Sequence, residues 1–253
     1  MGGDGDTCRV SEPIVELRWA ADRFVTTAPG IVSRHSFSYG AHYDPSNVRH
    51  GRLLVCNEES LAVGAGFPDH PHADAEIVTW VLEGSLVHED SRGHSGVIHP
   101  GLAQRMSAGS GIVHSERNDG YRVDPDLPVA PARFVQMWLR PDRPGTSPSY
   151  EQRELDLAEL DRAWVPVASG DERDASIGIG AKGATLWVTR LGTGAFRDLP
   201  EAAHVHALLV AGEVEVEEVG ELHPGDALRI TRPASLRVEC RSPAELLVWT
   251  MSA

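Results

Sequence analysis

Two short pairs of metal-ligand residues constrain this sequence more than any other feature. His70 and His72 are separated by one residue, and so are His114 and Glu116. Because side chains alternate between the two faces of a β-strand, each pair points to one side of its strand. If the two strands are neighbours, three imidazoles and one carboxylate meet at a single point. Such a set suits a divalent transition metal, and iron, nickel, copper, manganese and zinc are all compatible with it.

Three β-rich runs separated by turns connect the two pairs. The first, Ile77 to Leu82, ends at Glu83-Gly84, and the second, Leu86 to Glu89, leads to a turn at Arg92-Gly93. A third approaches His99-Pro100-Gly101, after which the chain returns to His114. Runs bounded by such turn residues are typical of antiparallel hairpins, so the sequence predicts that both pairs lie in one β domain.

The composition favours an all-β architecture. The 253 residues include 17 prolines and 25 glycines, and no long stretch keeps a helical repeat of apolar residues. A chain of this length can form one large β domain or two smaller ones. The net charge is −14, from 37 acidic and 23 basic residues, and such a surface repels phosphate backbones. Direct binding to nucleic acid is therefore disfavoured.

Three further features bear on where the protein works. No apolar run approaches the roughly 18 residues of a membrane span. The first 12 residues lack the basic start and the apolar core of a signal peptide. Cys8, Cys56 and Cys240 are far apart, which is typical of reduced thiols rather than of a disulfide framework. The sequence therefore predicts a cytoplasmic protein with no membrane contact.

Two motifs around the histidines resemble those of the cupin superfamily. The first comprises Gly64, His70, His72 and Glu76; the second comprises Gly111, His114 and Asn118, with Gly109 where that motif usually has proline. Four ordered blocks resemble the pirin family of cupins, and its bacterial branch in particular: RHSFSYG (34–40), HPHADAEIVTW (70–80), MSAGSGIVHSE (106–116) and FVQMWLRPD (134–142). The resemblance is strong over about residues 30–150.

The resemblance implies roles for two glutamates. It assigns the fourth ligand position to the glutamate of the HSE segment, Glu116. Glu76 shares the strand parity of His72, and we expect it to orient a ligating imidazole rather than to bind the metal itself.

An internal repeat indicates two barrels. Gly212 followed by Pro224-Gly225 mirrors Gly84 followed by Pro100-Gly101. Together with the resemblance, this repeat predicts a bicupin, in which two antiparallel β-barrels of jelly-roll type face each other and are joined by short helical connections. We expect a metal-binding barrel over residues 1–139, a linker over 140–182 with a short helix within Leu155 to Trp164, and a second barrel over 183–253.

The repeat also predicts that only the first barrel binds metal. Aligning the two barrels on their turns places four residues of the second barrel at the ligand positions: Asp198, Pro200, Val238 and Cys240. These do not form a ligand set. His204 and His206 repeat the His-x-His spacing, but His204 falls at the level of Glu76. We therefore expect one metal per chain.

The remaining histidines and large side chains have plainer expected roles. His88, His94 and His99 belong to predicted hairpins and are expected at the surface. Three residues are expected in the core or lining a pocket: Trp80, Met106 and Trp138. No glycine-rich phosphate loop, GxSxG motif or catalytic cysteine–histidine spacing is present, so nucleotide-dependent and serine-hydrolase activities lack support.

The charge of the predicted site points to its chemistry. Three neutral imidazoles and one carboxylate around a divalent ion leave a net charge of about +1, which favours one anionic ligand such as an enolate. Closed structural zinc sites usually include cysteine, and none lies near these residues. The resemblance implies a dioxygenase that cleaves a flavonol such as quercetin with O₂ (a quercetinase). We expect Glu116 to act as the base, because its carboxylate would lie beside the open coordination positions of the metal. Fe²⁺ is the favoured metal, and nickel, copper, manganese, cobalt and zinc are alternatives.

Two other functions fit the same sequence. The first is a metal- or redox-responsive interaction protein, a pirin-type transcription or metabolic cofactor that binds a protein partner without turnover. The second is a metal-dependent isomerase or hydrolase, because the cupin fold supports many reactions. Flavonol-dependent O₂ uptake distinguishes the dioxygenase from both.

Overall fold

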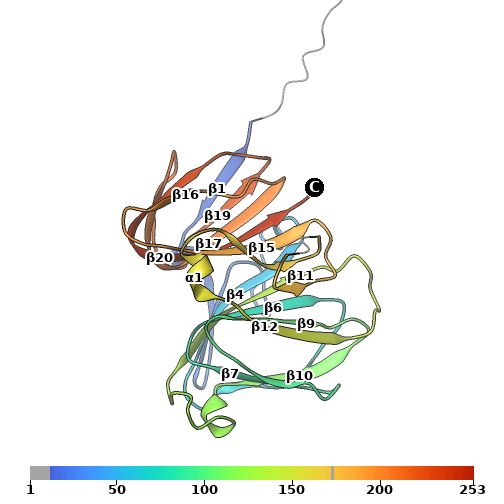
Figure 1. Ribbon diagram of the computed structural model, residues 1–253. Coiled ribbons are helices and arrows are strands. Elements are labelled where there is room, and N and C mark those ends of the chain that lie inside the picture. Colours follow the sequence, from blue (N-terminus) through green and yellow to red (C-terminus); the bar gives the residue numbers. More distant parts are fainter. Residues whose placement is uncertain (1–11, 172–173) are drawn as a thin grey trace, which may run out of the picture.

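The computed structural model describes residues 12–171 and 174–253, and nearly all of its regular structure is β-strand. Figure 1 shows two units stacked one on the other, with the green and cyan strands of the N-terminal half in one and the orange and red strands of the C-terminal half in the other. The all-β bicupin prediction is confirmed.

The first unit consists of two sheets. The larger has seven strands, in the order β12 (Ser149–Glu154), β9 (Leu102–Ser107), β6 (Glu76–Glu83), β11 (Ala132–Leu139), β4 (Leu53–Leu61), β3 (Ile31–His35) and β2 (Phe24–Ala28). The smaller has four strands, in the order β5 (Gly66–His72), β10 (Ile112–Arg117), β7 (Leu86–Asp90) and β8 (Ser95–Ile98). All of these pairings are antiparallel.

The second unit is one nine-stranded sheet. Its main order is β1 (Ile14–Arg18), β19 (Ala227–Thr231), β17 (His204–Val216), β20 (Arg237–Met251), β15 (Ala184–Leu191), β13 (Val165–Ser169) and β14 (Ile177–Gly178). β16 (Phe196–Asp198) pairs with β20, and β18 (Gly220–Leu222) pairs with β17. The interior of this unit is apolar, with Leu209, Val214, Val238 and Leu246 among its buried side chains.

The two units pack through an apolar layer between their large sheets. Val78 and Met137 of the first unit belong to the same buried cluster as Leu247 and Trp249 of the second. Trp80 on β6 also lies in this layer, where its indole Nε1 donates a hydrogen bond to Glu245 Oε1 at 2.7 Å. One face of β6 therefore packs against the second unit, and side chains on that face, including Glu76, point away from the interior of the first unit.

Segments near both ends of the first unit cross to the second. β1 pairs with β19, and the chain then passes through a 3₁₀ turn, Ala20–Asp22, to reach β2. Residues 140–182, predicted as a linker, supply β12 to the first unit and β13 and β14 to the second. The predicted short helix is α1 (Leu157–Leu160), which begins with the Asp156 carboxylate accepting a hydrogen bond from the Ala158 amide. A second 3₁₀ turn spans Gly120–Arg122.

The internal repeat is visible in two equivalent glycines. Gly84 follows β6 and Gly212 lies within β17, with φ angles of 71° and 74°, in the left-handed region that favours glycine. A Cβ at Gly84 would collide with the backbone of Pro131-Ala132, and one at Gly212 with that of Pro243-Ala244. The same backbone crossing therefore occurs in both units. No helix in the described ranges is both long and apolar enough to cross a membrane.

Candidate metal centre

The two predicted ligand pairs lie on adjacent strands. β5 and β10 run antiparallel, with His114 directly opposite His70 and Ile112 opposite His72. The pairing is irregular between His114 and Glu116, where Glu116 lies opposite Phe67. Alternation along each strand turns all three imidazoles to one face of the small sheet.

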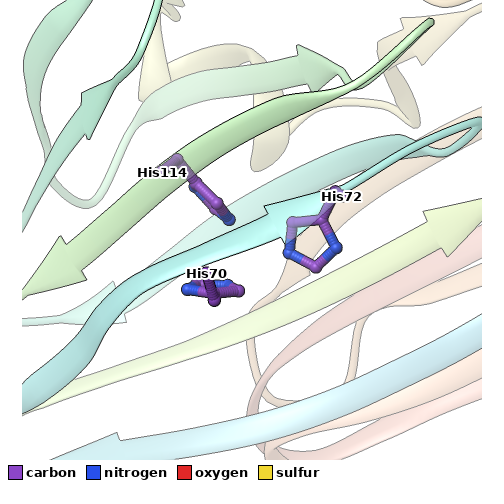
Figure 2. A group of neighbouring side chains, drawn as sticks. All are labelled: His70, His72 and His114. Carbon is purple, nitrogen blue, oxygen red and sulfur yellow. The ribbon is translucent and has the colours of Figure 1, made fainter.

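The three imidazoles converge on one point. One ring nitrogen from each of His70, His72 and His114 lies within 4.8 Å of the others. The ring centroids are 4.4 Å apart for His70 and His114, 4.8 Å for His70 and His72, and 5.0 Å for His72 and His114. Figure 2 shows the rings approaching one another from the two strands.

The ring nitrogens have the properties that a metal requires. The Nε2 atoms of His72 and His114 are buried and have no hydrogen-bond partner among the described residues. A buried polar atom without a partner is costly, and a bound divalent ion removes that cost. Burial, with the nearby His70 ring, lowers the pKa of His72 to about 4 and that of His114 to about 2. Both rings are therefore neutral near pH 7, as ligation requires.

The site is closed on one side and open on the other. His114 is 1% exposed, whereas His70 and His72 are partly exposed. The Trp138 indole lies against His72, with ring centroids 4.7 Å apart, and the ring of Tyr39 meets Trp138 edge-on at 5.7 Å. Of the three large residues considered from sequence, Trp138 is thus the one beside the predicted ligands. Trp80 lies between the units, and Met106 is fully buried.

Glu116 is as fully buried as His114, and more so than His70 and His72. Gln136 Nε2 donates hydrogen bonds to both of its carboxylate oxygens, at 3.0 and 2.8 Å, and Trp138 Nε1 donates to Gln136 Oε1 at 2.9 Å. Burial raises the pKa of Glu116 to about 7, although the Gln136 hydrogen bonds act in the opposite direction. The Glu116 carboxylate forms a second group with His88 and His114. The four predicted ligands therefore fall into two groups that share His114.

His88 was expected at the surface, and that expectation is wrong. It is 0% exposed and lies opposite Glu116 in the pairing of β7 with β10. Its Nε2 is 3.4 Å from Asp90 Oδ2, and its Nδ1 is 3.4 Å from the Nδ1 of His114. The burial of His88 follows from strand pairing. Residues that lie opposite each other on paired strands point to the same face of the sheet, so His88 faces the same interior as Glu116.

This arrangement selects one tautomer of His114. If Asp90 accepts the Nε2–H of His88, the Nδ1 of His88 is free to accept the Nδ1–H of His114. The Nε2 of His114 then keeps its lone pair for a metal, as in the carboxylate–histidine pairs that support metal ligands. Although burial acts to raise it, hydrogen bonds from the His94 and Arg92 amides lower the pKa of Asp90, so its carboxylate is charged near pH 7.

Glu76 does not lie beside the imidazoles, so its predicted role in orienting a ligand is wrong. It lies opposite Leu139 on the face of β6 that contacts the second unit, where it accepts a hydrogen bond from Ser107 Oγ at 2.6 Å. A Cβ added at Gly180 would collide with its carboxylate, so Glu76 lies beside Gly180. Glu76 does not share the face of His72 because the chain turns between β5 and β6. Asp74 in that turn has a φ of 51°, so alternation does not continue from His72 to Glu76.

The other histidines lie outside the ligand groups. His94 and His99 have partly exposed side chains that contact Asp90 and Glu154. In the second unit, Val238 and Cys240 belong to the apolar core, Asp198 pairs with the exposed Arg237, and His206 is buried against Phe37. Within residues 12–171 and 174–253, both candidate metal groups lie in the first unit.

Comparisons with known proteins agree with this architecture. The family model described as Pirin matches residues 19–139, and that described as Quercetinase C-terminal cupin domain matches residues 166–251. The structure of YhhW from Escherichia coli, titled a bacterial pirin in its nickel(II) complex, superposes on this chain with a TM-score of 0.83, at 30% identity, covering 95% of this chain and 100% of that one. The chain belongs to the pirin family.

Curated relatives of this pirin carry enzyme names. A Mycobacterium tuberculosis protein named "Putative quercetin 2,3-dioxygenase" is 48% identical over 240 residues, which covers 94% of this chain and 96% of the relative. An Escherichia coli protein named "Quercetin 2,3-dioxygenase" is 31% identical over 241 residues, which covers 94% of this chain and 99% of the relative. The suspected family is thus confirmed over nearly the whole length of the chain.

Proposed function

We propose that this pirin is a metal-dependent dioxygenase that cleaves a flavonol such as quercetin with O₂. The observation that supports this most is the convergence of His70, His72 and His114, with two buried ring nitrogens that lack partners, at a partly exposed face of the first unit. The names of the relatives supply the substrate class.

The proposed metal ligands are His70, His72, His114 and Glu116, which would hold one divalent transition ion per chain, with Fe²⁺ favoured. A related pirin, YhhW, has been solved in complex with nickel(II), which supports a transition ion at this site. When bound, the ion would supply Lewis-acid and redox chemistry to an enol oxygen and to O₂. Structural sites are usually closed, whereas this one keeps an open side for a substrate.

Glu116 would also act as the base. A flavonol must lose the proton of its 3-hydroxyl before its oxygen can act as an anionic ligand, and the Glu116 carboxylate would accept that proton at one of its oxygens. A base works best when its pKa is close to the working pH; in the metal-free protein burial raises the pKa of Glu116 into that range, and a bound cation would lower it. Gln136 would hold the carboxylate in place, and Trp138 would hold Gln136.

Trp138 would also help to position the substrate. Its ring stands edge-on against His72, and both are partly exposed. An aromatic face beside a metal centre offers a contact for the rings of a flavonol. We also infer a cytoplasmic location, which is supported by the free, buried thiols of Cys56 and Cys240.

The test is reconstitution followed by O₂ uptake. The metal-free protein is loaded anaerobically with iron, manganese, cobalt, nickel or copper and then mixed with quercetin and with simpler enols. We expect flavonol-dependent O₂ uptake with at least one metal and none without metal. Metal binding without uptake on any of these compounds would contradict the proposal and favour an interaction protein.

A further inference from the structure

A second, separate polar cavity lies between the two units. It has a volume of about 110 Å³ and lies beneath the N-terminal segment that crosses from β1 to β2. Its walls come from both units, with Arg23, Ser36 and Asn47 on one side and His206 and Arg229 on the other. None of the proposed metal ligands lines it.

Two buried guanidinium groups dominate this cavity. Arg229 is 4% exposed; its Nη2 donates to the carbonyl of Ser36 at 2.6 Å, and its guanidinium lies 4.2 Å from the centre of the Phe37 ring. Among the described residues no carboxylate lies within ion-pair distance of Arg229; the nearest acidic neighbour in the strand pairing is Glu16, opposite it on β1. The Arg23 side chain is 4% exposed; it donates to the Arg34 carbonyl at 2.8 Å and to Glu58 at 3.3 Å.

Several polar atoms around the cavity have no partner. They are the Nε atoms of Arg23 and Arg229, Nε2 of His206, Nδ1 of His35, Oγ of Ser36 and Oδ1 of Asn47, in the described part of the chain. Burial lowers the pKa of Arg229 to about 10 and that of His206 well below its usual value, with nearby arginines adding to the effect at His206. In both cases burial disfavours the charged form, and at Arg229 the nearby Glu16 carboxylate offsets this only in part.

The charges lining the cavity are unusual for this molecule. The chain carries a net charge of −14, yet the buried charged side chains lining the cavity are those of Arg23 and Arg229. The other charged lining residues are exposed: Arg18, which pairs with Glu16, and Asp22. Glu58 reaches Arg23 from outside the cavity and also pairs with Arg133, so it does not neutralise Arg229. A buried cation without a counter-charge is costly.

We propose that this interdomain cavity binds a small oxyanion, of the carboxylate or phosphate class, between Arg23 and Arg229. Planar guanidinium groups match the oxygens of both classes. Such an anion would satisfy the two free Nε–H groups and join the two units at one point. The volume limits its size, because a cavity of about 150 Å³ holds one molecule of benzene and this cavity is smaller. A flavonol is therefore too large, and this site is independent of the proposed activity.

The test is isothermal titration calorimetry with acetate and with inorganic phosphate, at constant ionic strength, on the full-length protein. We expect one saturable site for at least one of the two anions, and the anion that binds identifies the class. Because hydrogen bonds to charged groups contribute about 1.5–3 kcal/mol, Arg229→Gln and Arg23→Gln should each weaken binding roughly tenfold or more. Arg241→Gln, at an exposed surface ion pair, is the matched control and should leave binding unchanged.

Two outcomes would overturn the proposal. One is the absence of saturable binding for both anions; the other is equal affinity in the wild type and in the Arg229→Gln and Arg23→Gln variants, which indicates an adventitious ion only. Should these variants fail to fold, a wild-type crystal soaked in selenate decides the question. An anomalous peak between Arg23 and Arg229 supports the site, and water alone at that position contradicts it.

Discussion

At the scale of single residues, the metal-binding nitrogen of His114, Nε2, is kept free by His88, which is not itself a ligand in our proposal. His88 connects the buried Asp90 to His114 and so selects the tautomer that leaves Nε2 free. Loss of such a supporting contact typically weakens metal affinity by 10–100-fold. We therefore expect His88→Asn to weaken Ni²⁺ binding by roughly 10–100-fold, measured by competition with a chelator. The control His99→Asn, partly exposed on the same unit, should bind as the wild type does. Unchanged Ni²⁺ affinity in His88→Asn would mean that the contacts from Asp90 through His88 to His114 have no effect on metal binding.

The two glutamates should respond differently to the same substitution. Glu116→Gln keeps the size and one oxygen donor but removes the charge and the basicity. We expect this variant to retain some metal and to lose roughly two or more orders of magnitude in turnover, a range typical of a lost general base. Glu76→Gln should stay close to the wild type, because Glu76 faces the second unit. Rates of flavonol-dependent O₂ uptake measure both effects, and an inactive Glu76→Gln with a normal Glu116→Gln would reverse the assignment.

Glu59 should make the metal-free protein less stable as the pH rises. It is buried on β4, accepts a hydrogen bond from Ser33 Oγ, and has a pKa that burial raises to about 7. A carboxyl group with a raised pKa stabilises the fold below its unfolded pKa of about 4.3, and this contribution is lost as the pH approaches 7. Glu59→Gln cannot ionise. Its stability relative to the wild type should rise by roughly 1–3 kcal/mol between pH 4.5 and 7.5, measured by urea unfolding. A constant difference between the two proteins across that range would refute the shift.

Single residues also show where prediction from sequence works and where it fails. Alternation along one strand correctly predicted that His70 and His72 share a face. The assumption that the two strands are neighbours correctly predicted that His114 lies beside them. Alternation failed for Glu76 because a turn at Asp74 interrupts it. It could not find His88, because the register of β7 against β10 depends on long-range pairing.

At the scale of elements, the first and second units each have a glycine where two backbone segments pass close together, and we expect both glycines to be needed. Gly84 and Gly212 have positive φ angles, and a Cβ at either would meet the backbone of a neighbouring strand. Alanine at either position combines a strained conformation with a collision against rigid backbone. We expect Gly84→Ala and Gly212→Ala each to lower the free energy of unfolding by at least about 1–3 kcal/mol. Gly192→Ala, where an added Cβ meets nothing within 4 Å, should change it by only a few tenths. Similar stabilities for all three variants would show that the crossings tolerate a side chain.

Elements were predicted best where turn residues bound them. The runs before Gly84 and around Leu86 match β6 and β7, and the spacing of Gly212 revealed the repeat. The crossing of β1 to the second unit was not predicted, because Ile14 to Arg18 carry no mark of their partner. β12 and β13 also lie in a segment expected as a linker, where prolines obscure short strands.

At the scale of the whole molecule, the two units differ in what fills them. The first unit contains buried His114, Glu116 and Glu59, whereas Val238 and Cys240 of the second lie in an apolar core. We therefore expect one metal per chain, held by the first unit. Metal analysis should show near-complete loss in His70→Ala and retention in His204→Ala/His206→Ala. A ratio near two in the wild type, halved by the second variant, would place a site in the second unit.

Isotope incorporation tests whether the histidine cluster of the first unit supports cleavage of a flavonol by O₂. Wild-type protein loaded with Fe²⁺ is given quercetin and ¹⁸O₂, and the products are examined by mass spectrometry beside those of His70→Ala. We predict ring-opened product with two ¹⁸O atoms from the O₂ in the wild type and no product above background in His70→Ala. Intact quercetin in both samples, or equal ¹⁸O incorporation in both, would contradict the claim.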